Sequence, residues 1–497
     1  MNDFGKKENL SSRLSDPGLI RDRAYIDGDW VDGGEGKVFP VRDPAVGDVI
    51  TEVADLGMRD AEMAIAAAER AFNGWRRLTA KQRAAVLRAW HGLILANIDD
   101  LAKIMTAEQG KPVAEAKGEI AFGAAYVEWY AEEAKRVYGD TIPEYATDRR
   151  ILVLKQAIGV VGAITPWNYP SAMITRKCAP ALAAGCTIVL KPAEQTPLSA
   201  LALAELADRA GFPKGVFNVV TASDPVPVGE AMTASGAVRK VTFTGSTEIG
   251  KLLMAQGAKT VKKVTLELGG SAPFIVFDDA DLDAAIEGLM ASKFRCSGQT
   301  CVCANRILVE DGVYDDFADR FAAAVRTLKV GNGFESGVDQ GPLIDERAVE
   351  KVQRHVDDAV SRGARVIAGG RSHALGGTYY EPTVLTEVTD DMIVTREETF
   401  GPVAPLIRFK GEAEAIRRAN DTAYGLAGYF YTRDLGRAWR MAEELEVGSV
   451  GVNTGVMSTE VAPAGGVKES GTGREGSKYG IDDFLELKYV CMAGIDR

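Results

Sequence analysis

The sequence predicts an α/β protein with more than one lobe, and three observations lead to that expectation. The chain has 497 residues, which is more than one hydrophobic core usually fills. From about residue 157, short β-rich runs alternate with helical segments, as they do in a doubly wound parallel sheet. A second alternating region starts at residue 264, so we expect a second α/β lobe.

Each element follows from a local pattern. Residues 61–97 have apolar side chains at helical spacing, which predicts two amphipathic helices before the first sheet. The β-rich runs of the first lobe lie at 157–165, 186–192, 216–220 and 240–245, with helical segments at 170–185 and 199–211. The second region repeats the alternation, with strands expected at 264–270, 272–277, 305–311 and 364–370 and helices at 314–328 and 349–363.

One segment fits neither lobe. Residues 137–156, between the early helices and the first sheet, read as an extended arm with a turn. An extended arm outside a packed lobe is suited to pairing with another subunit. The segment is therefore a candidate for subunit pairing, and the family resemblance described below implies a homodimer or a homotetramer.

Composition excludes several classes of protein. The chain has a hydrophobic fraction of 46% and a formal net charge of −12. It contains no apolar run long enough to cross a bilayer, and its first residues have no apolar secretory core. The negative charge disfavours nucleic acid and acidic membranes as partners. Six scattered cysteines do not form a secreted disulfide framework, so we expect a cytoplasmic protein that acts on small molecules.

Two glycine motifs resemble phosphate-binding loops but match them poorly. GTGREG at 471–476 fits GxGxxG by letter, yet no βαβ unit follows it, and we interpret it as a turn. GSTEIGK at 245–251 lacks the Ser or Thr that a P-loop needs after its lysine, which argues against an ATPase. Gly245 and Ser246 still follow a predicted strand and precede a helix, so they form either a diphosphate contact or a plain turn.

The segment SGQTCVC at 297–303 places two thiols, Cys301 and Cys303, one residue apart. A zinc site needs four clustered ligands, and the three histidines, at 91, 355 and 373, are distant in the sequence. We therefore expect no metal, and we interpret His355 as a helix-surface residue. A disulfide between the two thiols would be strained and labile. Glycine and polar neighbours are poor core material, which favours a nucleophile over simple packing.

The residues around this segment resemble the active-site signature of the aldehyde dehydrogenase superfamily. The resemblance rests on VTLELGG, FRCSGQTCVCANR, TPWNYP, KPAEQTP, FTGSTEIG, EETFGPV and GVNTG, at 264–270, 294–306, 165–170, 191–197, 243–250, 397–403 and 451–455. Each motif stands in the family's order and together they span nearly the whole chain. The segments at 173–177 (MITRK), 293–295 (KFR) and 473–491 are most similar to succinate-semialdehyde or glutarate-semialdehyde dehydrogenases.

The resemblance implies oxidation of an aldehyde through a thiohemiacetal and a thioester on Cys301. The amide of Asn168 and the backbone N–H of Cys301 match the oxyanion hole. Glu267 matches the general base that activates water, and its apolar LELGG surroundings would raise its pKa. Lys177 and Glu475 match residues that relay the proton, although an ordinary ion pair explains them nearly as well. Cys303 is expected as a redox partner that traps Cys301 in a reversible disulfide.

The resemblance also implies a nicotinamide cofactor on a Rossmann-type domain without the usual glycine fingerprint. Lys191 and Glu194 match the adenosine ribose, Gly245 and Ser246 the diphosphate, and Glu398 the nicotinamide ribose. The other residues matched to the cofactor are Thr165, Pro166, Trp167, Pro192, Ala193, Leu268 and Phe400. Because a carboxylate at Glu194 repels a 2′-phosphate, we expect NAD, with NADP as the alternative.

The family's architecture implies three parts in this chain. These are an NAD-binding domain at 1–136 and 157–264, an α/β catalytic domain at 265–472, and a small β oligomerisation arm at 137–156 and 473–497. The expected fold class is therefore α/β, with an aldehyde dehydrogenase-like arrangement of these parts.

The expected substrate is a semialdehyde acid. Arg176, Arg295 and Ser458 match positions that hold the substrate carboxylate, a task that suits the planar fork of arginine; alternatively the arginines brace the fold. Succinate semialdehyde is the first choice and glutarate semialdehyde the second. Cys296 and Ala464 depart from the family, which usually has Asn and an aromatic there, and Ala464 widens the expected tunnel.

The same scaffold has two alternative functions. A CoA-acylating relative releases the acyl group to a thiol instead of water, and the presence of Glu267 argues against it. A non-catalytic binding protein on the same scaffold would be favoured by loss of Cys301, Asn168 or Glu267, and all three are present.

Overall fold

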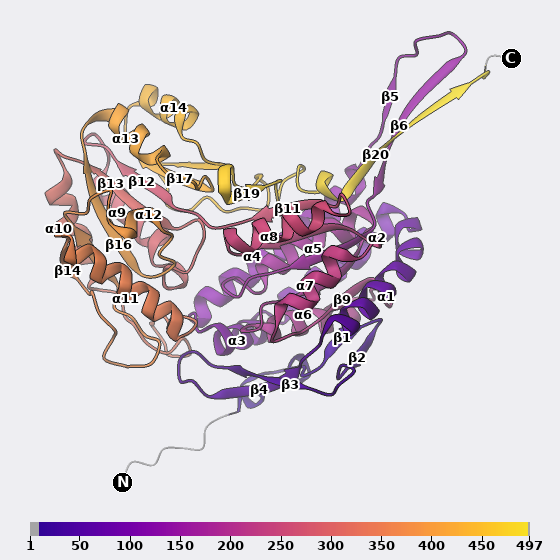
Figure 1. The fold of residues 1–497 in the computed structure, drawn as a ribbon, viewed down its shortest axis with the longest axis horizontal. Helices are drawn as coiled ribbons and strands as arrows, with labels where there is room; N and C mark the ends of the chain where they lie inside the picture. Colours follow the sequence, from indigo (N-terminus) through magenta and orange to yellow (C-terminus); the bar gives the residue numbers. More distant parts are fainter. Residues whose placement is uncertain (1–8, 496–497) are drawn as a thin grey trace.

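The computed structural model describes residues 9–495 as two α/β lobes from which a long arm projects (Figure 1). An eight-stranded sheet forms the centre of one lobe and a seven-stranded sheet the centre of the other. The α/β class with two alternating lobes, expected from the sequence, is confirmed.

The first sheet has the strand order β19-β11-β10-β7-β8-β9-β1-β2. Its central strands run parallel to one another, and only the edges, β1, β2 and β19, pair antiparallel. The strands are β1 (Ala24–Ile26), β2 (Asp29–Val31), β7 (Val160–Ile164), β8 (Thr187–Lys191), β9 (Phe217–Val219), β10 (Val238–Thr244), β11 (Lys263–Glu267) and β19 (Gly471–Thr472). The segment 264–270, expected to open the second lobe, therefore belongs largely to the first sheet.

Helices cover both faces of this sheet. They are α1 (Met58–Arg77), α2 (Ala80–Ala96), α3 (Ile98–Gln109), α4 (Val113–Glu133), α5 (Ala172–Ala184), α6 (Pro197–Arg209), α7 (Pro225–Ala234) and α8 (Thr247–Ala258). One face, with Val161 and Ile188, packs on α2 to α6, and the other, with Val160 and Val189, packs on α1 and α7. Alternation of side chains along each buried strand produces these two cores.

The break between the two predicted early helices has a local cause. Thr79 lies between α1 and α2, and its hydroxyl accepts the N–H of Gln82 while the Gln82 side chain accepts the N–H of Thr79. This reciprocal capping box satisfies backbone donors that a helix start leaves unpaired. The two amphipathic helices expected within 61–97 are confirmed.

The second sheet has the order β14-β15-β16-β13-β12-β17-β18, and only the β14–β15 pair is antiparallel. Its strands are β12 (Ala272–Val276), β13 (Ala304–Glu310), β14 (Arg365–Ala368), β15 (Thr383–Thr386), β16 (Val403–Phe409), β17 (Ala427–Tyr431) and β18 (Ser449–Val452). Its helices are α9 (Leu282–Lys293), α10 (Tyr314–Val325), α11 (Glu346–Ser361), α12 (Ile393–Arg396), α13 (Gly411–Asn420) and α14 (Leu435–Glu444).

The arm is a three-stranded antiparallel sheet of order β20-β6-β5 that projects away from both lobes (Figure 1). It consists of β5 (Asp140–Ile142), β6 (Arg149–Ala157) and β20 (Leu485–Ala493). Strand β20 pairs with the whole of β6, from Leu485 opposite Ala157 to Ala493 opposite Arg149. The extended arm with a turn, expected from residues 137–156, is confirmed.

The remaining elements are short. Strands β3 (Val38–Arg42) and β4 (Val49–Ala54) form a separate hairpin. Single 3₁₀ turns are η1 (Leu10–Arg13), η2 (Pro17–Leu19), η3 (Ala134–Arg136), η4 (Arg295–Gly298), η5 (Lys468–Ser470) and η6 (Asp482–Phe484). Within residues 9–495, none of the helices has the length and apolar character needed to cross a bilayer.

Candidate active site

Two cavities meet at Cys301. One has a volume of about 370 Å³ and the other about 350 Å³. Cys301, Asn168 and Thr244 line both of them. The thiol thus stands where a molecule in one cavity can touch a molecule in the other.

The loop before Cys301 is held in an unusual backbone conformation. Cys296, Ser297 and Gly298 have φ values of 50°, 56° and 74°, a region that costs non-glycine residues free energy. A Cβ atom on Gly298 would lie 2.2 Å from the carbonyl oxygen of Gly401, so only glycine fits there. The side chain of Gln299 braces the turn by donating to the Cys296 carbonyl at 3.1 Å and accepting the Ile344 N–H at 2.9 Å.

Asn168 faces Cys301 across the mouth of both cavities. Its side-chain Nδ2 donates to the carbonyl of Gln299 at 2.8 Å, which fixes the amide and leaves its second N–H for another acceptor. Between residues 9 and 495, no acceptor for the backbone N–H of Cys301 is found. The structure therefore brings together the two donors that the sequence suggested.

A buried ion pair holds the backbone of Asn168 in place. Lys111 Nζ lies 2.5 Å from Glu119 Oε2 and donates to the backbone carbonyl of Asn168 at 2.7 Å. Glu119 Oε1 accepts the N–H groups of Ser171 and Ala172 at 3.0 and 3.1 Å. Both charged side chains are almost fully buried. Sequence reasoning missed this pair, whose only signal is a Lys and a Glu in a segment of helical pattern.

Glu267 is the last residue of β11 and lies among buried groups. Its Oε2 is 3.8 Å from Nη2 of Arg176, and its Oε1 has no hydrogen-bond partner in the described part of the chain. Burial, followed by repulsion from the neighbouring Glu475, raises the pKa of Glu267 to about 8. A carboxyl group with this pKa can act as a general base near neutral pH.

Glu475 joins the two basic residues of α5. Lys177 Nζ forms a buried ion pair with Glu475 Oε1, and Arg176 Nε lies 2.6 Å from Glu475 Oε2 at an angle that makes no hydrogen bond. Burial alone would raise the pKa of Glu475, but Lys177 and Arg176 outweigh it and hold the pKa below its ordinary value. Glu475 is therefore ionised while Glu267 is mostly protonated at neutral pH.

The two neighbouring thiols have different surroundings. Burial raises the pKa of the Cys301 thiol to about 12, and Glu398 adds to the effect. Cys303 is buried, with its Sγ 3.4 Å from the Gly298 carbonyl and 3.8 Å from Lys293 Nζ. Only Cys301 reaches the two cavities.

The larger cavity lies at the carboxyl end of β10, where β10 leads into α8. The hydroxyl of Ser246 caps α8 by accepting the Ile249 N–H at 3.4 Å. A Cβ atom on Gly245 would lie 2.3 Å from the ring of Phe243. Helix starts at the ends of parallel strands are where phosphate groups bind, and Gly245 and Ser246 both line the larger cavity.

The opposite wall of that cavity carries Glu398 and two aromatic rings. Glu398 Oε1 accepts the Gly270 N–H at 3.0 Å, and burial raises the pKa of Glu398 to about 7. The rings of Trp167 and Phe400 stand perpendicular, with centroids 5.5 Å apart. Pro166 and Leu268 complete this lining as expected.

Five residues matched to the cofactor do not line the cavity itself. They are Thr165, Lys191, Pro192, Ala193 and Glu194. They lie where β7 and β8 end side by side, with the Thr165 N–H donating to the Lys191 carbonyl at 3.1 Å. Lys191 Nζ is 3.0 Å from Glu194 Oε2. Gln195, next in the chain, does line the cavity, as do Asp345, Arg347 and Lys351 around the start of α11, which no motif marked.

The cavity fits a dinucleotide. It offers a helix start without a Cβ at Gly245 for the diphosphate, and the buried Oε1 of Gln195 and Oγ1 of Thr244 have no partner in the protein between residues 9 and 495. Buried polar atoms are normally hydrogen-bonded, so these atoms indicate a polar ligand. No group of three metal-ligating side chains exists in this described range.

The smaller cavity is lined by charged and aromatic side chains. Arg176 on α5, Arg295 in η4 and Ser458 all reach it, together with Glu115, Phe122 and Tyr169. The Nε of Arg295 has no hydrogen-bond partner in the described residues, whereas Arg176 is held by Glu475 and Glu267. The three matched residues thus meet in one cavity. The Nε of each arginine makes no hydrogen bond, but Arg176 has two carboxylates within ion-pair distance and Arg295 has none among residues 9–495.

The two family departures lie just outside this cavity. The Cys296 Sγ accepts from Gln109 Nε2 at 3.3 Å and lies 3.6 Å from the Asn168 carbonyl, so it packs behind the oxyanion residue. Ala464 exchanges backbone hydrogen bonds of 2.8 Å with Glu475. Ala464 therefore adjoins the Glu475 ion pairs.

Comparison with known proteins agrees with this geometry. Residues 30–490 match the model of the aldehyde dehydrogenase family. The chain belongs to the aldehyde dehydrogenase family. Its fold matches that of succinate-semialdehyde dehydrogenase from Burkholderia pseudomallei, with a TM-score of 0.96 and 60% identity over 97% of this chain and 99% of that one. It also matches an NAD⁺ complex of betaine aldehyde dehydrogenase from Staphylococcus aureus, with a TM-score of 0.95 and 36% identity over 98% and 97%.

Several characterised relatives are about 60% identical to this aldehyde dehydrogenase. Glutarate-semialdehyde dehydrogenase of Pseudomonas aeruginosa is 62% identical over 97% of this chain and 100% of its own. The NADP-dependent succinate-semialdehyde dehydrogenase of Escherichia coli is 60% identical over 97% and 99%. A 3-sulfolactaldehyde dehydrogenase of Pseudomonas putida is also 60% identical, over 97% and 99%. The enzyme class expected from the sequence is confirmed.

In this aldehyde dehydrogenase, the residues that follow the nucleophile loop anchor the cofactor wall. The side chain of Asn305 on β13 donates to the Glu397 carbonyl at 3.2 Å and accepts the Thr399 N–H at 3.1 Å. It thereby fixes both neighbours of Glu398. Asn305 lies only four residues after Cys301, so one short segment supplies both the thiol shared by the two cavities and the support of the cavity wall.

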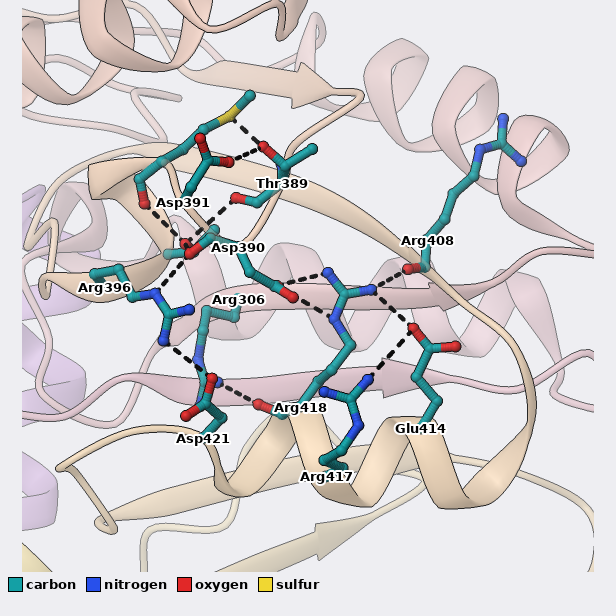
Figure 2. Close-up of polar contacts among 12 residues, drawn as sticks. Arg306, Thr389, Asp390, Asp391, Arg396, Arg408, Glu414, Arg417, Arg418 and Asp421 are labelled. Atoms are coloured by element: carbon teal, nitrogen blue, oxygen red, sulfur yellow. Dashed lines mark hydrogen bonds and ion pairs between the residues drawn. The ribbon is translucent and has the colours of Figure 1, made fainter.

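The next residue, Arg306, connects the site to an arginine and aspartate cluster (Figure 2). Arg306 donates to the carbonyls of Ser271, Arg418 and Ala419 at 2.7 to 3.2 Å. Figure 2 shows Arg418 turned toward Asp390, at 2.6 Å, while Arg306 holds the Arg418 backbone. Because Ser271 follows the Gly269–Gly270 pair beside Glu398, this cluster supports the cofactor cavity and is not a separate site.

The interpretation of His355 as a helix-surface residue is wrong. Its side chain is fully buried on α11, with Nδ1 3.2 Å from Thr399 Oγ1 and Nε2 3.2 Å from Glu397 Oε2. Burial lowers its pKa to about 4, so the ring is neutral at pH 7. The ring packs against the same 397–400 loop that Asn305 fixes, a contact between distant segments that helical periodicity alone did not reveal.

Proposed function

We propose that this aldehyde dehydrogenase oxidises a semialdehyde acid to the dicarboxylic acid, with succinate semialdehyde as the first substrate and glutarate semialdehyde as the second. The observation that supports this most is Arg295, which lines the cavity beside Cys301 and has, among residues 9–495, neither a hydrogen bond at its buried Nε nor an ion-pair partner for its charge. A buried guanidinium with a free donor favours an anionic ligand. The relatives named for these two semialdehydes agree with it.

In the proposed reaction, the sulfur of Cys301 attacks the aldehyde carbon and the carbonyl oxygen becomes an oxyanion. The free N–H of Asn168 and the backbone N–H of Cys301 stabilise that charge, and loss of one such donor typically costs about 10² to 10³ in rate. Because the Cys301 thiol has a pKa raised to about 12, its proton has to pass to a neighbouring carboxylate, Glu267 in its ionised form, as the bond to carbon forms.

A nicotinamide cofactor bound in the larger cavity would supply a hydride acceptor. Trp167, Leu268 and Phe400 would line the channel for the nicotinamide ring, and Glu398 would hold the adjoining ribose. Gly245 and Ser246 would hold the diphosphate at the start of α8. Thr165, Pro166, Pro192 and Ala193 would form the remaining contacts at the ends of β7 and β8.

Hydrolysis of the thioester completes the reaction. Glu267 takes a proton from water as the oxygen attacks the acyl carbon, and the carbon–sulfur bond breaks. Lys177 and Glu475 lie next to Glu267. They either relay that proton or remain an ion pair that adjusts the charge around Glu267. A nearby ionised Glu475 keeps Glu267 basic, since it raises the pKa of Glu267 beyond the effect of burial.

We propose NAD as the preferred cofactor and NADP as the alternative. Glu194 lies beside Lys191 at the end of β8, where its carboxylate can accept hydrogen bonds from both ribose hydroxyls. A 2′-phosphate would be repelled by the same carboxylate. The Escherichia coli relative is named for NADP, so this choice distinguishes members of one family.

We further propose that the protein is a cytoplasmic homodimer or homotetramer assembled through its arm. Strand β5 is exposed along its whole length and forms the free edge of the arm sheet. Free strand edges pair readily with another chain. Light scattering of the intact protein and of a variant lacking 140–150 tests the assembly: a monomeric intact protein would contradict it.

The proposed domains follow the expected division. The NAD-binding domain is 1–136 and 157–264, the catalytic domain 265–472 and the arm 137–156 and 473–497. Residues 1–8 and 496–497 of this division lie outside the described residues. The boundary at 264/265 falls inside β11 (Lys263–Glu267), so Glu267 sits where the two domains join.

Cys303 is proposed as a redox partner of Cys301. Peroxide would convert the Cys301 thiol to a sulfenic acid. The Cys303 sulfur would then attack the sulfenic sulfur to form a disulfide, and the hydroxyl group would leave as water with the Cys303 proton. The expected result is that dithiothreitol restores the activity of the peroxide-treated wild type more fully than that of Cys303→Ala. Equal recovery of the two proteins would contradict a disulfide.

The central test is a panel of aldehydes offered with NAD or NADP, with and without CoA, while NADH or NADPH absorbance is followed. Succinate and glutarate semialdehydes should have the highest kcat/KM, an uncharged aldehyde of equal length a lower one, and CoA should have no effect. Higher efficiency with uncharged aldehydes would contradict the proposed substrate. CoA-dependent turnover would indicate the acylating reaction instead.

A further inference from the structure

A row of buried polar side chains runs along one face of β10 and β11, away from the active site. Parallel pairing sets Thr242 beside Thr265 and Thr244 beside Glu267. Because side chains alternate along a strand, Lys240, Thr242 and Thr244 project from the same face. The residues between them, including Phe243 and Leu266, form a hydrophobic cluster on the other face.

The row is polar at every position although it is buried. Lys240, Thr242 and Thr265 are between 0 and 3% exposed. The Oγ1 atoms of Thr242 and Thr244 have no hydrogen-bond partner in the protein between residues 9 and 495. A strand interior is normally filled with apolar side chains when both faces are covered, so packing alone does not explain three threonines and a lysine here.

The row has two ends with different surroundings. At the inner end, Thr244 lines both cavities and lies beside Glu267. At the outer end, Lys240 Nζ contacts Thr265 Oγ1, and Thr265 Oγ1 donates to Asp483 Oδ2 at 3.2 Å. Asp483 is half-buried in η6, at the base of the arm. The row therefore lies between Glu267 and the carboxylate of Asp483, with printed contacts at its outer end and unpartnered hydroxyls at its inner end.

A glycine makes the outer contact possible. A Cβ atom on Gly473, which has φ +88°, would lie 2.8 Å from Asp483 Oδ2 and 2.6 Å from a Thr265 methyl carbon. Any larger residue would occupy the place where Thr265 and Asp483 meet. The GTGREG segment, interpreted from sequence as a turn, thus leaves room for this hydrogen bond.

We propose that Lys240, Thr265 and Asp483, reached through Thr242, form the exit by which the proton taken up by Glu267 leaves the enzyme. The inference rests on the proposed hydrolytic function. Hydroxyl groups pass a proton by donating one hydrogen bond while accepting another. The proposal requires a bridging water at Thr244 and Thr242, because the hydroxyls of these two residues make no hydrogen bond to residues 9–495.

The proton balance of hydrolysis requires such an exit. Water gives one proton to Glu267 and its oxygen bonds to the acyl carbon. The carbon–sulfur bond breaks, its electron pair leaves with sulfur, and the sulfur takes the proton of the new carboxylic acid. One proton per hydrolysis then remains on Glu267, and the next cycle begins only after it has left.

The charges around Lys240 suit a residue that exchanges protons. Burial lowers the pKa of Lys240 to about 8, the carboxylates Asp483 and Glu475 act in the opposite direction, and Lys263 and Lys177 lower it again. The ammonium also lies 4.9 Å from the centre of the Phe484 ring. Lys240 and Glu267 thus have pKa values near 8, so transfer between them needs little free energy.

The test uses p-nitrophenyl acetate, which acylates Cys301 without cofactor or semialdehyde. The p-nitrophenolate burst reports acylation, and the following steady rate reports hydrolysis of the acetyl-enzyme. Thr265→Val and Lys240→Met should leave the burst unchanged and slow deacylation about tenfold or more, since positioned proton transfer is worth about 10² to 10⁴. Thr265→Ser keeps the hydroxyl and should restore the rate, and the solvent deuterium isotope effect on deacylation should grow in the two slow variants.

Thr187→Val is the matched control, since Thr187 is a fully buried threonine of β8 in the same sheet whose hydroxyl donates to the Ala68 carbonyl. It should not change the ratio of burst to steady rate. Wild-type deacylation in both Thr265→Val and Lys240→Met would overturn the proposal. A parallel fall of acylation and deacylation would also overturn it, because it indicates a structural role. Failure to oxidise semialdehydes while these ester results hold would refute only the proposed substrate.

Discussion

The larger cavity, proposed for the cofactor, and the smaller cavity, proposed for the aldehyde, share Cys301, Asn168 and Thr244, yet different groups form them. The cofactor cavity is formed by loops at the carboxyl ends of strands, with a helix start at Ser246 and a missing Cβ at Gly245. The aldehyde cavity is formed by side chains of α4, α5 and η4, several of them charged. Under the proposed function, backbone groups would recognise what all nicotinamide cofactors share, and side chains would select one substrate among many.

The shared residues should therefore matter most, and Cys301 above all. Cys301→Ala removes the atom that binds the aldehyde carbon, so dehydrogenase turnover should fall below detection. Cys303→Ala should keep turnover within about threefold of wild type, because Cys303 lies outside both cavities and its loss is a small core change. NADH formation with saturating aldehyde measures both. Retained turnover in Cys301→Ala would show that the nucleophile is a different group.

Glu267 comes next, and its effect depends on pH. Because burial raises the pKa of Glu267 to about 8, the carboxyl group becomes a base only as the pH rises through that value. Deacylation should accelerate with increasing pH and level off above about 8. Glu267→Gln should remove this dependence and slow deacylation by about 10² to 10⁴. A pH profile of acetyl-enzyme hydrolysis decides the matter: an unchanged profile in the variant would assign the titration to another group.

Substitutions of the two arginines of the aldehyde cavity should affect different kinetic constants. Arg295 lines the cavity and has no ion-pair partner among residues 9–495, so Arg295→Gln should raise KM for the semialdehyde acid about 10- to 100-fold, equivalent to about 1.5 to 3 kcal/mol for a charge-assisted hydrogen bond. KM for an uncharged aldehyde of equal length should barely change. Arg176 is paired with Glu475 and Glu267, so Arg176→Gln should lower kcat for both aldehydes.

Comparison of the charged and uncharged aldehydes, each with both variants, provides the control. Arg88→Gln, in α2 and paired at the surface with Glu132, should change neither constant. Equal losses for the two aldehydes in Arg295→Gln would return Arg295 to a structural role and leave the carboxylate without its main contact.

The difference between the cavities also explains what could be predicted from sequence. Cys301, Gly245 and Ser246 lie in short contiguous motifs, where strand, turn and helix start follow one another, and the structure places all three at the cavities. Lys111 and Glu119 were missed, because the contacts of Lys111 with the Asn168 carbonyl and of Glu119 with the start of α5 join segments about 50 residues apart. Hydrophobic periodicity shows which face of a helix is buried, but not which segment packs against that face.

His355 and β11 show the same limit from the other side. The surface reading of His355 failed because its partners, Glu397 and Thr399, come from a distant loop. The strand at 264–270 was identified correctly as a strand, but its pairing with β10 placed it in the first sheet. Local sequence patterns predict the helices and strands. Which strand or loop each of them packs against depends on tertiary contacts that one sequence does not display.

Cofactor choice should show the smallest effect, because Glu194 acts at one end of a long ligand and outside the cavity next to Cys301. The wild type should have a higher kcat/KM with NAD than with NADP, since its carboxylate accepts from the ribose hydroxyls and repels a phosphate. Glu194→Ser removes the repulsion and supplies a hydroxyl donor, and should shift the NAD to NADP ratio toward NADP by on the order of tenfold, the worth of about one hydrogen bond. The burst of p-nitrophenolate should be the same in both proteins, because Glu194 does not touch the acyl group.

The half-exposed carboxylate of Glu194 is paired with Lys191 at 3.0 Å, so Glu194→Gln, which keeps the size but not the charge, separates electrostatic repulsion from shape. If Glu194→Gln and the wild type have the same cofactor ratio, charge is not the reason for the preference, and the cofactor cavity discriminates through residues around the start of α11 such as Arg347 and Lys351.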